Sequence, residues 1–421
     1  MDAPRRDRNG APSLPPAVDV VVVGAGAAGM MAAIEAARRG RRTLLLEKNE
    51  RPGLKILISG GGRCNLTTTK AGADLEAQYG AARGRFLRHA LRAFPPTALR
   101  ALVEQAGVPL QEEDLDKLFP VSQRARDVVD ALLRLVDQSG ARLVGGAAVR
   151  EVARADDGGF VVRTDGGAVA AASVVLATGG LSYPKTGATG DGYAWCRALG
   201  HTVTATHPAL APLAVDAPWV RELQGIVLHD VALTSLDAAR RPVTTRTRPI
   251  LFTHKGLSGP APMDLAGDVE EAHAGGAVRF DFAPEARAED LEREWLTAGA
   301  AHGARRVDSV LPAGLPERVR AALCAQAGGN PTLATWSRAQ RRALLAALKG
   351  LVVPVARSLG YGHAEVTRGG VALAEVDART MQSKVCPGLF VCGELLDVDG
   401  PIGGFNFQAA FATGRLAGLT A

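Results

Sequence analysis

Two glycine-rich segments near opposite ends of the chain have residue types and spacing suited to holding a nucleotide. In the first, a β-branched run over 19–23 precedes Gly24, Gly26 and Gly29, which fit the pattern GxGxxG. The first glycine allows a sharp turn, the second lets the backbone approach a pyrophosphate, and the third lets the following helix pack on the strand. Ala28 lies in the first turn of that expected helix, whose free amides favour phosphate. We therefore expect a dinucleotide to bind here.

An acidic residue stands where the ribose of such a ligand is recognised. A second expected strand over 43–46 ends at Glu47, eighteen residues after Gly29. A carboxylate at this place accepts hydrogen bonds from both hydroxyls of an adenosine ribose and repels a 2′-phosphate. Lys48 follows directly and is also assigned to cofactor binding. A glycine-rich turn in some other kind of α/β unit is the alternative interpretation.

The segment near the C-terminus predicts contacts to the other end of the same ligand. A short buried strand over 388–392 leads into an acidic loop, and glycines then open a helix. Contacts at both ends of an extended dinucleotide favour FAD over NAD, and the start of the helix would stabilise negative charge on a flavin ring. The residues assigned to this end of the site are Gly393, Glu394, Asp399, Gly404, Phe405, Asn406 and Phe407.

Three further motifs would border the flavin ring, and the third of them, residues 251–267, contains His254. GLKILISGGGRCNLT, residues 53–67, places three consecutive glycines beside polar residues, and such a loop exposes backbone amides to a flat group. A flexible linker is the alternative for this segment. VVLATGG, residues 174–180, is an expected buried strand that would pass its end near the cofactor. The cofactor contacts assigned to these motifs are Lys55, Gly61, Gly62, Arg63, Asn65, Ala177, Thr178 and Gly179.

Proton transfer has three candidate residues, in the order His254, then Cys64 or Tyr183. His254 lies in the motif FTHKGLSGP, residues 252–260, between an expected strand and a helix. The alternatives are a hydrogen-bonded structural histidine at 254 and a packed loop thiol at 64.

The spacing of the cysteines and the lack of a second nucleotide motif limit the possible chemistry further. The five cysteines form neither a CxxC pair nor a zinc-like spacing, so we expect no disulfide framework and no metal site. A second strand-linked GxGxxG followed by an acid is absent. We therefore expect NAD(P)H to bind only transiently at the flavin face, or electrons to come from the substrate or another protein.

The elements that must position these residues alternate between strand and helix. The chain has 421 residues, 47% of them hydrophobic and 22% charged, which is typical of globular proteins. The longest apolar stretch contains three glycines and is too short to span a bilayer, so we expect a cytoplasmic protein without membrane contact. The pattern predicts an α/β fold: a discontinuous Rossmann-like FAD-binding domain with an inserted β-barrel-like domain and a small helical domain. The predicted ranges are a disordered tail at 1–17, the FAD-binding domain at 18–200 and 363–421, the β-rich domain at 201–285 and 351–362, and the helical domain at 286–350.

Taken together, the motifs resemble the YhiN/BaiN-type flavoproteins, the aminoacetone-oxidase-like family. The resemblance runs from about Val18 to Gly418 and implies FAD as the cofactor and a three-part architecture. Family activities range from amine oxidation to reduction of carbon–carbon double bonds in steroid-like substrates and of uridine in ribosomal RNA. The motifs that carry it are GAGAAG, SGGGRCNLT, SYPKTGATGDGY, FTHKGLSGP, VTRGGV, TMQSK and the C-terminal glycine block.

Three hypotheses about function follow. The leading one is an FAD-dependent oxidoreductase that acts on an unidentified small molecule by hydride transfer at the flavin N5. The second is a reductase that forms dihydrouridine in ribosomal RNA, a partner suggested by the family resemblance and the arginine-rich segments 240–248 and 338–342. The third is a flavin-binding redox sensor without catalytic activity.

Overall fold

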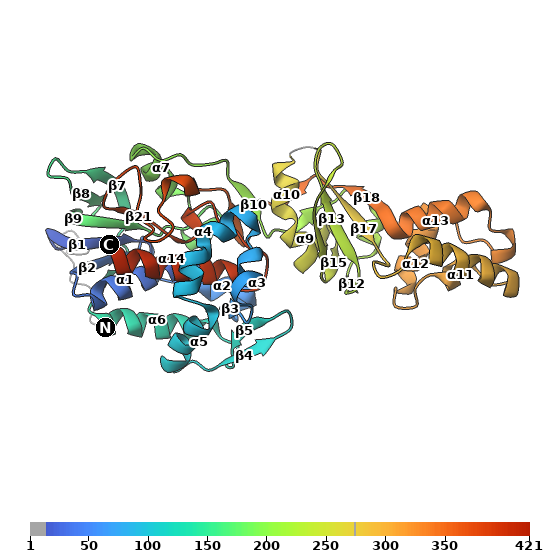
Figure 1. The fold of residues 1–421 in the computed structure, drawn as a ribbon, viewed down its shortest axis with the longest axis horizontal. Coiled ribbons are helices and arrows are strands. Elements are labelled where there is room, and N and C mark those ends of the chain that lie inside the picture. Colours follow the sequence, from blue (N-terminus) through green and yellow to red (C-terminus); the bar gives the residue numbers. More distant parts are fainter. Residues whose placement is uncertain (1–13, 273–274) are drawn as a thin grey trace. The chain divides into compact units, whose positions relative to one another are not determined.

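The computed structural model describes residues 14–272 and 275–421 and divides the chain into two compact units (Figure 1). Unit 1 consists of the residues up to Thr206 together with Glu365–Ala421, and unit 2 consists of His207–Ala364. The predicted tail lies outside the described residues over 1–13, and the first strand begins at Ala17. Each unit has its own buried apolar cluster.

Unit 1 is built on a mixed seven-stranded sheet with the order β6-β2-β1-β9-β8-β7, in which β21 also pairs with β9. The β6, β2, β1, β9 and β21 pairings are parallel, whereas β7, β8 and β9 pair antiparallel. Runs of buried valine and leucine are typical of parallel strands covered on both faces. The predicted α/β fold is therefore confirmed. The strands are β1 (Ala17–Val23), β2 (Thr43–Leu46), β6 (Arg142–Val144), β7 (Val149–Arg154), β8 (Phe160–Thr164), β9 (Gly167–Leu176) and β21 (Leu389–Val391).

The register of this sheet brings four strand ends together. The last residues of β1, β2, β9 and β21 are paired with one another in neighbouring strands. Because these strands are parallel, their carboxyl ends meet at one edge of the sheet, where ligands bind in open α/β folds. The loops that leave this edge begin at Gly24, Glu47, Ala177 and Cys392.

Two helices from opposite ends of the sequence pack together beside this sheet, α1 (Ala27–Arg38) and α14 (Phe405–Thr420) (Figure 1). A Cβ at Gly414 would overlap the carbonyl oxygen of Ala28, and one at Gly418 would overlap that of Ala32. Glycines four positions apart lie on the same helix face. Their missing side chains let the two backbones approach closely, so the start of α14 is fixed relative to the glycine turn before α1.

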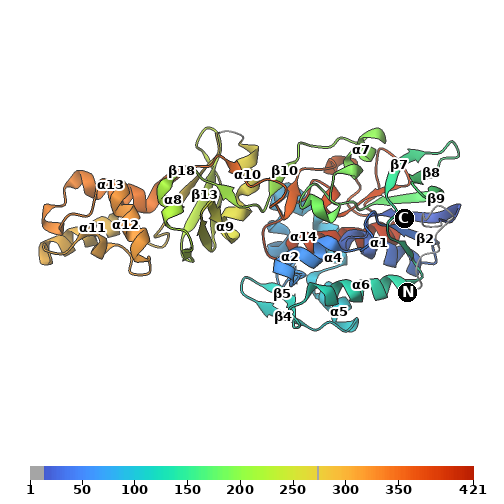
Figure 2. The same ribbon diagram turned by 180° about the vertical axis from the view of Figure 1, so that it is seen from behind.

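Smaller elements complete unit 1. Helix α6 packs against α1, and α5 and α6 lie beside the small sheet of β3, β5 and β4 (Figure 2). The remaining elements are α2 (Leu54–Gly62), β3 (Thr67–Thr68), α3 (Gly72–Ala77), α4 (Gly80–Ala93), α5 (Pro96–Gln105), β4 (Leu110–Glu113), β5 (Lys117–Pro120), α6 (Ala125–Ser139), α7 (Asp191–Ala198) and β20 (Val366–Arg368).

Unit 2 contains two antiparallel sheets and a helical segment. The sheets have the orders β12-β15-β16-β11-β19 and β14-β13-β17-β18. One buried cluster includes Phe252 and Phe280 from the strands and Trp295 and Leu344 from the helices. Closure into a barrel, and a division into separate β and helical domains, stay predictions.

The elements of unit 2 are β10 (His207–Ala209), β11 (Leu213–Ala214), α8 (Pro218–Glu222), β12 (Val227–Leu228), β13 (Ala232–Leu236), β14 (Pro242–Thr247), β15 (Ile250–Thr253), β16 (Gly256–Ser258), α9 (Pro260–Asp264), α10 (Ala266–Glu271), β17 (Ala277–Asp281), α11 (Ala288–Ala301), α12 (Glu317–Gln326), α13 (Arg338–Gly350), β18 (Leu351–Pro354) and β19 (Arg357–Ser358). In the described part of the chain, no helix has the length and apolar character needed to cross a membrane.

The close approach of α1 and α14 makes a prediction about stability. Alanine normally stabilises a helix relative to glycine, but Gly414→Ala would press a methyl group into the backbone of α1. We expect Gly414→Ala to lower the free energy of unfolding by about 1–3 kcal/mol in urea denaturation. Gly350→Ala, where a Cβ meets no atom within 4 Å, is the matched control and should not destabilise. Equal effects of the two changes would contradict the proposed packing.

Candidate cofactor site

The glycine turn after β1 is tightly packed at two positions and open at the third. Gly24 has a φ of +100°, and a Cβ there would lie 2.6 Å from the carbonyl oxygen of Ala177. A Cβ at Gly29 would overlap the carbonyl oxygen of Gly24, whereas a Cβ at Gly26 would meet no atom within 4 Å. The open side of the turn therefore lies at Gly26, directly before the N-terminus of α1. This is the space and the polarity that a pyrophosphate needs.

Glu47 is oriented by the same turn. Its Oε2 accepts a hydrogen bond from the Ala25 amide at 2.8 Å, and its Oε1 accepts from the Asn49 amide at 2.9 Å and from Asn49 Nδ2 at 2.8 Å. These donors hold the carboxylate at the end of β2, where the ribose contact was predicted. The neighbouring Lys48 pairs with Asp191 at the start of α7, with 2.7 Å between Nζ and Oδ2. A cofactor contact from Lys48 stays a prediction.

The segment that contains the predicted glycine loop begins as a helix at Leu54, and the helical conformation ends at Ser59, directly before the glycines. Gly60, Gly61 and Gly62 have φ values of +55°, +69° and +84°, a run that L-residues rarely adopt. A Cβ at Gly60 would lie 3.0 Å from the Asn65 amide nitrogen, but a Cβ at Gly61 would meet nothing within 4 Å. One side of the loop is thus packed, and the other is open at Gly61, as a flat group would require.

Arg63, which follows these glycines, is engaged by the β4–β5 region. Its Nη1 lies 2.9 Å from Glu113 Oε2 and 2.8 Å from Gln123 Oε1. The guanidinium also stacks over Phe119, at 4.2 Å from the ring centroid. These contacts hold the glycine loop on the small sheet, and a role of Arg63 in cofactor binding stays a prediction.

Asn65 links the glycine loop to the start of α14. With its amide placed so that both groups are satisfied, its nitrogen donates to Thr67 O at 3.2 Å and its oxygen accepts from the Gly404 amide at 3.0 Å. Asn406 closes the preceding turn, since its Oδ1 accepts from the Gly400 amide at 2.9 Å and its Nδ2 donates to Gly400 O at 2.9 Å. Both asparagines were predicted site residues, and both position the backbone of this helix start.

The first turn of α14 has unpaired backbone amides of partial positive charge, as every helix start does. The Phe405 side chain is fully buried, and its carbonyl oxygen accepts from the Tyr79 hydroxyl at 2.8 Å. Phe405 can therefore offer a ligand only its backbone, while Phe407 is half-buried. Sequence reasoning missed Tyr79, because a single tyrosine in the turn between α3 and α4 carries no motif.

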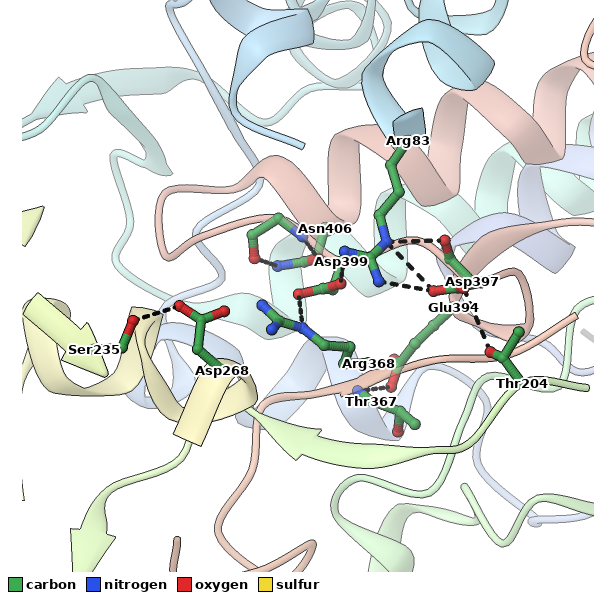
Figure 3. Close-up of polar contacts among 11 residues, drawn as sticks. Arg83, Thr204, Ser235, Asp268, Thr367, Arg368, Glu394, Asp397, Asp399 and Asn406 are labelled. Atoms are coloured by element: carbon green, nitrogen blue, oxygen red, sulfur yellow. Dashed lines mark hydrogen bonds and ion pairs between the residues drawn. The ribbon is translucent and has the colours of Figure 1, made fainter. Parts of the chain in front are cut away.

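Glu394 is the centre of a polar cluster drawn from four distant segments. It lies in a short 3₁₀ turn, η6 (Gly393–Leu395), directly after β21. Its Oε1 accepts from the Thr367 amide at 2.9 Å (Figure 3). The same Oε1 accepts from Ser182 Oγ at 2.8 Å, and Oε2 is paired with Lys55. Glu394 and Lys55 were both predicted as cofactor contacts. Their ion pair and the roles of Ser182 and Thr367 were not.

Asp399 bridges two arginines. Its Oδ1 lies 3.1 Å from Arg83 Nη1, and its Oδ2 lies 3.1 Å from Arg368 Nε; Arg83 also pairs with Asp397 at 2.9 Å (Figure 3). Since Asp399 is only 7% exposed, it needs such partners. The network fastens the acidic loop to α4 and β20. Neither arginine was predicted, although Arg368 lies within the VTRGGV motif, and a direct cofactor contact from Asp399 stays a prediction.

The three candidates for proton transfer differ in their surroundings. Cys64 is fully buried, and burial raises the pKa of its thiol to about 12, which favours the packed-thiol alternative. Tyr183 is half-buried, and burial together with the Glu365 charge raises the pKa of its phenol. His254 is exposed in the two-residue turn between β15 and β16 of unit 2.

These residues fit an extended dinucleotide in unit 1. The open cradle at Gly26, the oriented carboxylate of Glu47 and the start of α14 are the features that such a ligand requires, and Ala177, Thr178 and Gly179 leave the same sheet edge. Over residues 14–272 and 275–421, no group of three or more His, Cys, Asp or Glu is placed to hold a metal ion.

The burial of the cysteines makes a prediction about their reactivity. All five are free and buried, and burial raises the thiol pKa to about 12 at Cys64, Cys196 and Cys392 and to about 11 at Cys324. Because the thiolate is the reactive form, we expect no fast reaction with Ellman's reagent at pH 8 in the native protein and full reaction in guanidinium chloride. Rapid native labelling of Cys64, located by peptide mapping, would restore it as a proton donor.

Known proteins similar to this chain were found by sequence. A family profile described as HI0933-like protein Rossmann domain matches residues 18–420. The chain is 35% identical over 399 residues to a ribosomal RNA dihydrouridine synthase of Escherichia coli strain K12, covering 94% of this chain and 96% of that protein. It is 30% identical over 407 residues to a 3-dehydro-bile acid delta(4,6)-reductase of Clostridium scindens, covering 95% and 98%.

Solved structures with a similar fold were also found. A 3-ketosteroid delta1-dehydrogenase of Sterolibacterium denitrificans matches with a TM-score of 0.53 and 14% identity, covering 96% of this chain and 99% of that one. At this identity the likeness shows the fold alone. The sequence matches confirm the predicted family resemblance and, with it, FAD as the cofactor and an oxidoreductase as the enzyme class. The chain belongs to the HI0933-like family.

Proposed function

We propose that this FAD-dependent oxidoreductase reduces a carbon–carbon double bond conjugated to a carbonyl group, and that its substrate is uridine in ribosomal RNA. The observation that carries the proposal is the 35% identity over 94% of the chain to a ribosomal RNA dihydrouridine synthase. A second protein of that name, from Haemophilus influenzae, is 29% identical over 412 residues and covers 95% of this chain. Both matches extend over both units.

The names of the relatives point to one reaction type. Uridine has a double bond between C5 and C6 that is conjugated to the C4 carbonyl, and dihydrouridine lacks it. A delta(4,6)-reductase of a 3-dehydro-bile acid acts on double bonds conjugated to a 3-ketone. In both cases a hydride adds to a double-bond carbon from which the resulting negative charge is delocalised onto the carbonyl oxygen, and a proton then adds to carbon. This common chemistry supports a reductase over the amine oxidase that the family resemblance also allowed.

The residues of unit 1 have separate roles in holding the cofactor. When bound, FAD supplies the hydride from its reduced ring. Gly26 and the start of α1 would hold the pyrophosphate, Glu47 the adenosine ribose and Glu394 the ribityl hydroxyls. The amides at the start of α14 would stabilise negative charge on the ring carbonyls. NAD(P)H as a transient electron donor belongs to the same proposal.

The proton that completes the reduction needs a donor. His254 and Tyr183 are retained as candidates, and the raised pKa of Tyr183 keeps its phenol protonated at neutral pH, as an acid requires. The burial of Cys64 speaks against contact with a substrate.

A polynucleotide substrate needs positive charge at the surface, and the chain has a net charge of +6. Arg338 and Arg342 are exposed and lie four positions apart, hence on one face of α13. In the other arginine-rich segment, Arg248 pairs with buried Asp264 at 2.9 Å. Helix α13 is therefore the better supported candidate for phosphate contacts.

The open position in the glycine turn allows a test of cofactor binding that leaves the fold intact. Gly26 has a φ of −85°, which alanine adopts freely, and its Cβ would point into empty space. We expect Gly26→Ala to raise the Kd for FAD by about tenfold or more, measured by fluorescence titration of the apoprotein, with an unchanged Tm. Unchanged FAD affinity in a folded Gly26→Ala protein would place the pyrophosphate elsewhere.

The substrate is tested with RNA directly. We expect the FAD-loaded protein with NADH or NADPH to convert uridine to dihydrouridine in ribosomal RNA from a strain lacking the gene, detected by mass spectrometry of nucleosides. The Gly26→Ala protein without FAD is the matched control. Dihydrouridine that is intact in ribosomal RNA of the deletion strain would sink the RNA proposal. Turnover of a small conjugated ketone would then favour the small-molecule hypothesis. Lack of turnover with every acceptor tested would favour the redox sensor.

A further inference from the structure

His201, Glu375 and Ser383 form a chain of hydrogen bonds in unit 1, in which His201 and Ser383 are buried and Glu375 is partly exposed. The Nδ1 of His201 lies 3.1 Å from Glu375 Oε2, and its Nε2 lies 2.7 Å from Ser383 Oγ. The imidazole has no exposed surface. Ser383 belongs to the TMQSK motif at 380–384, which the proposed function leaves without a role.

The order serine, histidine, acid is that of many hydrolases, but Ser383 is not placed to act as a nucleophile. It is only 5% exposed. Its Oγ already accepts hydrogen bonds from the Val385 amide at 3.1 Å and from the Cys386 amide at 2.7 Å. A hydroxyl oxygen has two lone pairs, and both are engaged here. The chain of hydrogen bonds therefore holds structure in place and does not attack a substrate.

The same contacts determine where the protons of His201 lie. With both lone pairs of Ser383 Oγ engaged, the hydroxyl hydrogen is directed at Nε2, which must then be an acceptor. Nδ1 carries the ring hydrogen and donates it to Glu375, whose Oε2 also accepts from the Thr202 amide at 2.8 Å. A hydrogen on Nε2 would be a third donor to Ser383 Oγ, beside the Val385 and Cys386 amides. The arrangement is satisfied only by the Nδ1–H form.

One end of this chain holds the backbone that leads into Glu394. Ser383 and its neighbours run antiparallel to β21, on the edge that β9 does not occupy. The Ser383 amide donates to Leu389 O at 2.8 Å, and the Val391 amide donates to Met381 O at 3.0 Å. Only Cys392 lies between the end of β21 and η6, so the position of the strand determines the position of Glu394.

The other end holds the backbone that leaves Glu394. Glu375 lies four positions after Val371 in the sequence. The Val371 amide donates to Leu395 O at 2.9 Å, and the Val371 carbonyl accepts from the Asp397 amide at 3.1 Å. His201 thus connects the segment supporting β21 with the segment supporting Leu395–Asp397. The segments that they support, β21 and Leu395–Asp397, lie on either side of Glu394 in the sequence.

We propose that His201, in its neutral Nδ1–H form, is a positioning residue of the cofactor site. By joining Ser383 to Glu375 it holds together the two supports of η6 and so fixes the place of Glu394. The inference rests on the proposed function only in taking Glu394 as a contact to FAD.

The first experiment needs no cofactor. In the full-length apoprotein with ¹⁵N-labelled histidine, we expect the His201 ring to show a protonated Nδ1 and an unprotonated Nε2 at pH 7.5, its signals being assigned by their loss in His201→Gln. Hydrogen exchange should then show faster exchange at the Leu395 and Val391 segments of His201→Gln, with unchanged exchange in β1. An Nε2–H ring, or a uniform loss of protection across the sheet, would overturn the positioning role.

The second experiment measures FAD affinity. A neutral imidazole donor needs an acceptor but not a charge, so Glu375→Gln should keep the wild-type Kd within about twofold, whereas Glu375→Leu and Ser383→Ala should each raise it about tenfold. His89→Gln, at an exposed histidine of α4, is the control and should change nothing. A Glu375→Gln protein as weak as Glu375→Leu would contradict the neutral form.

A Glu394→Ala variant distinguishes a failure of the positioning role of His201 from a failure of the assignment of Glu394 as a contact to FAD. If it weakens FAD binding while Ser383→Ala does not, the positioning role is wrong. If Glu394→Ala itself binds FAD normally, the assignment of Glu394 in the proposed function is wrong, and the exchange experiment alone decides whether His201 holds η6.

Discussion

The pairing of β9 with β1 on one side and β21 on the other is the constraint on which the cofactor site depends. In this arrangement the last residues of these strands are in register, and their carboxyl ends lie at one edge of the sheet. The glycine turn, the ATGG segment and the acidic loop come from residues that are more than 150 positions apart, yet all three leave from that edge. A shift of one residue in β21 would turn its side chains to the opposite face and move Glu394 away. The site therefore exists only because the C-terminal segment returns to the sheet that the N-terminal segment began.

Close backbone contacts at glycine make this return possible. Gly24 packs on Ala177, Gly29 on Gly24, and Gly414 and Gly418 on α1. A side chain at any of these positions would separate elements that must touch. Gly26 differs, because its missing side chain leaves space and no protein atom fills it. Glycine thus has two physical roles in the same few residues: it allows packing within the protein, and it keeps room for a ligand.

Charged residues near the sheet edge are held in pairs, as the cost of removing charge from water demands. Glu394 is held by Lys55 and Asp399 by two arginines, so the acidic loop is ordered by contacts within the protein. The hydrogen bonds of His201 join the segments that contact β21 and Leu395–Asp397, before and after Glu394 in the sequence. A binding site for a dinucleotide that extends across the sheet edge needs such support, because its contacts must be in place together. The relatives reduce different substrates, a bile acid and uridine in RNA, which is consistent with a common cofactor site and varied surroundings.

The sequence by itself determined the parts that depend on local order. The glycine spacing at 24–29, the strand at 43–46 with Glu47 at its end, and the helix that begins at Phe405 are short-range patterns, and backbone geometry permits few other structures for them. Only the tertiary structure decided which distant side chains meet. It paired Lys55 with Glu394 and Arg83 with Asp399, directed Arg63 to Glu113, and buried Cys64. Such pairings depend on the register of strands far apart in the chain, and a single arginine or serine has no periodic signal that announces its partner.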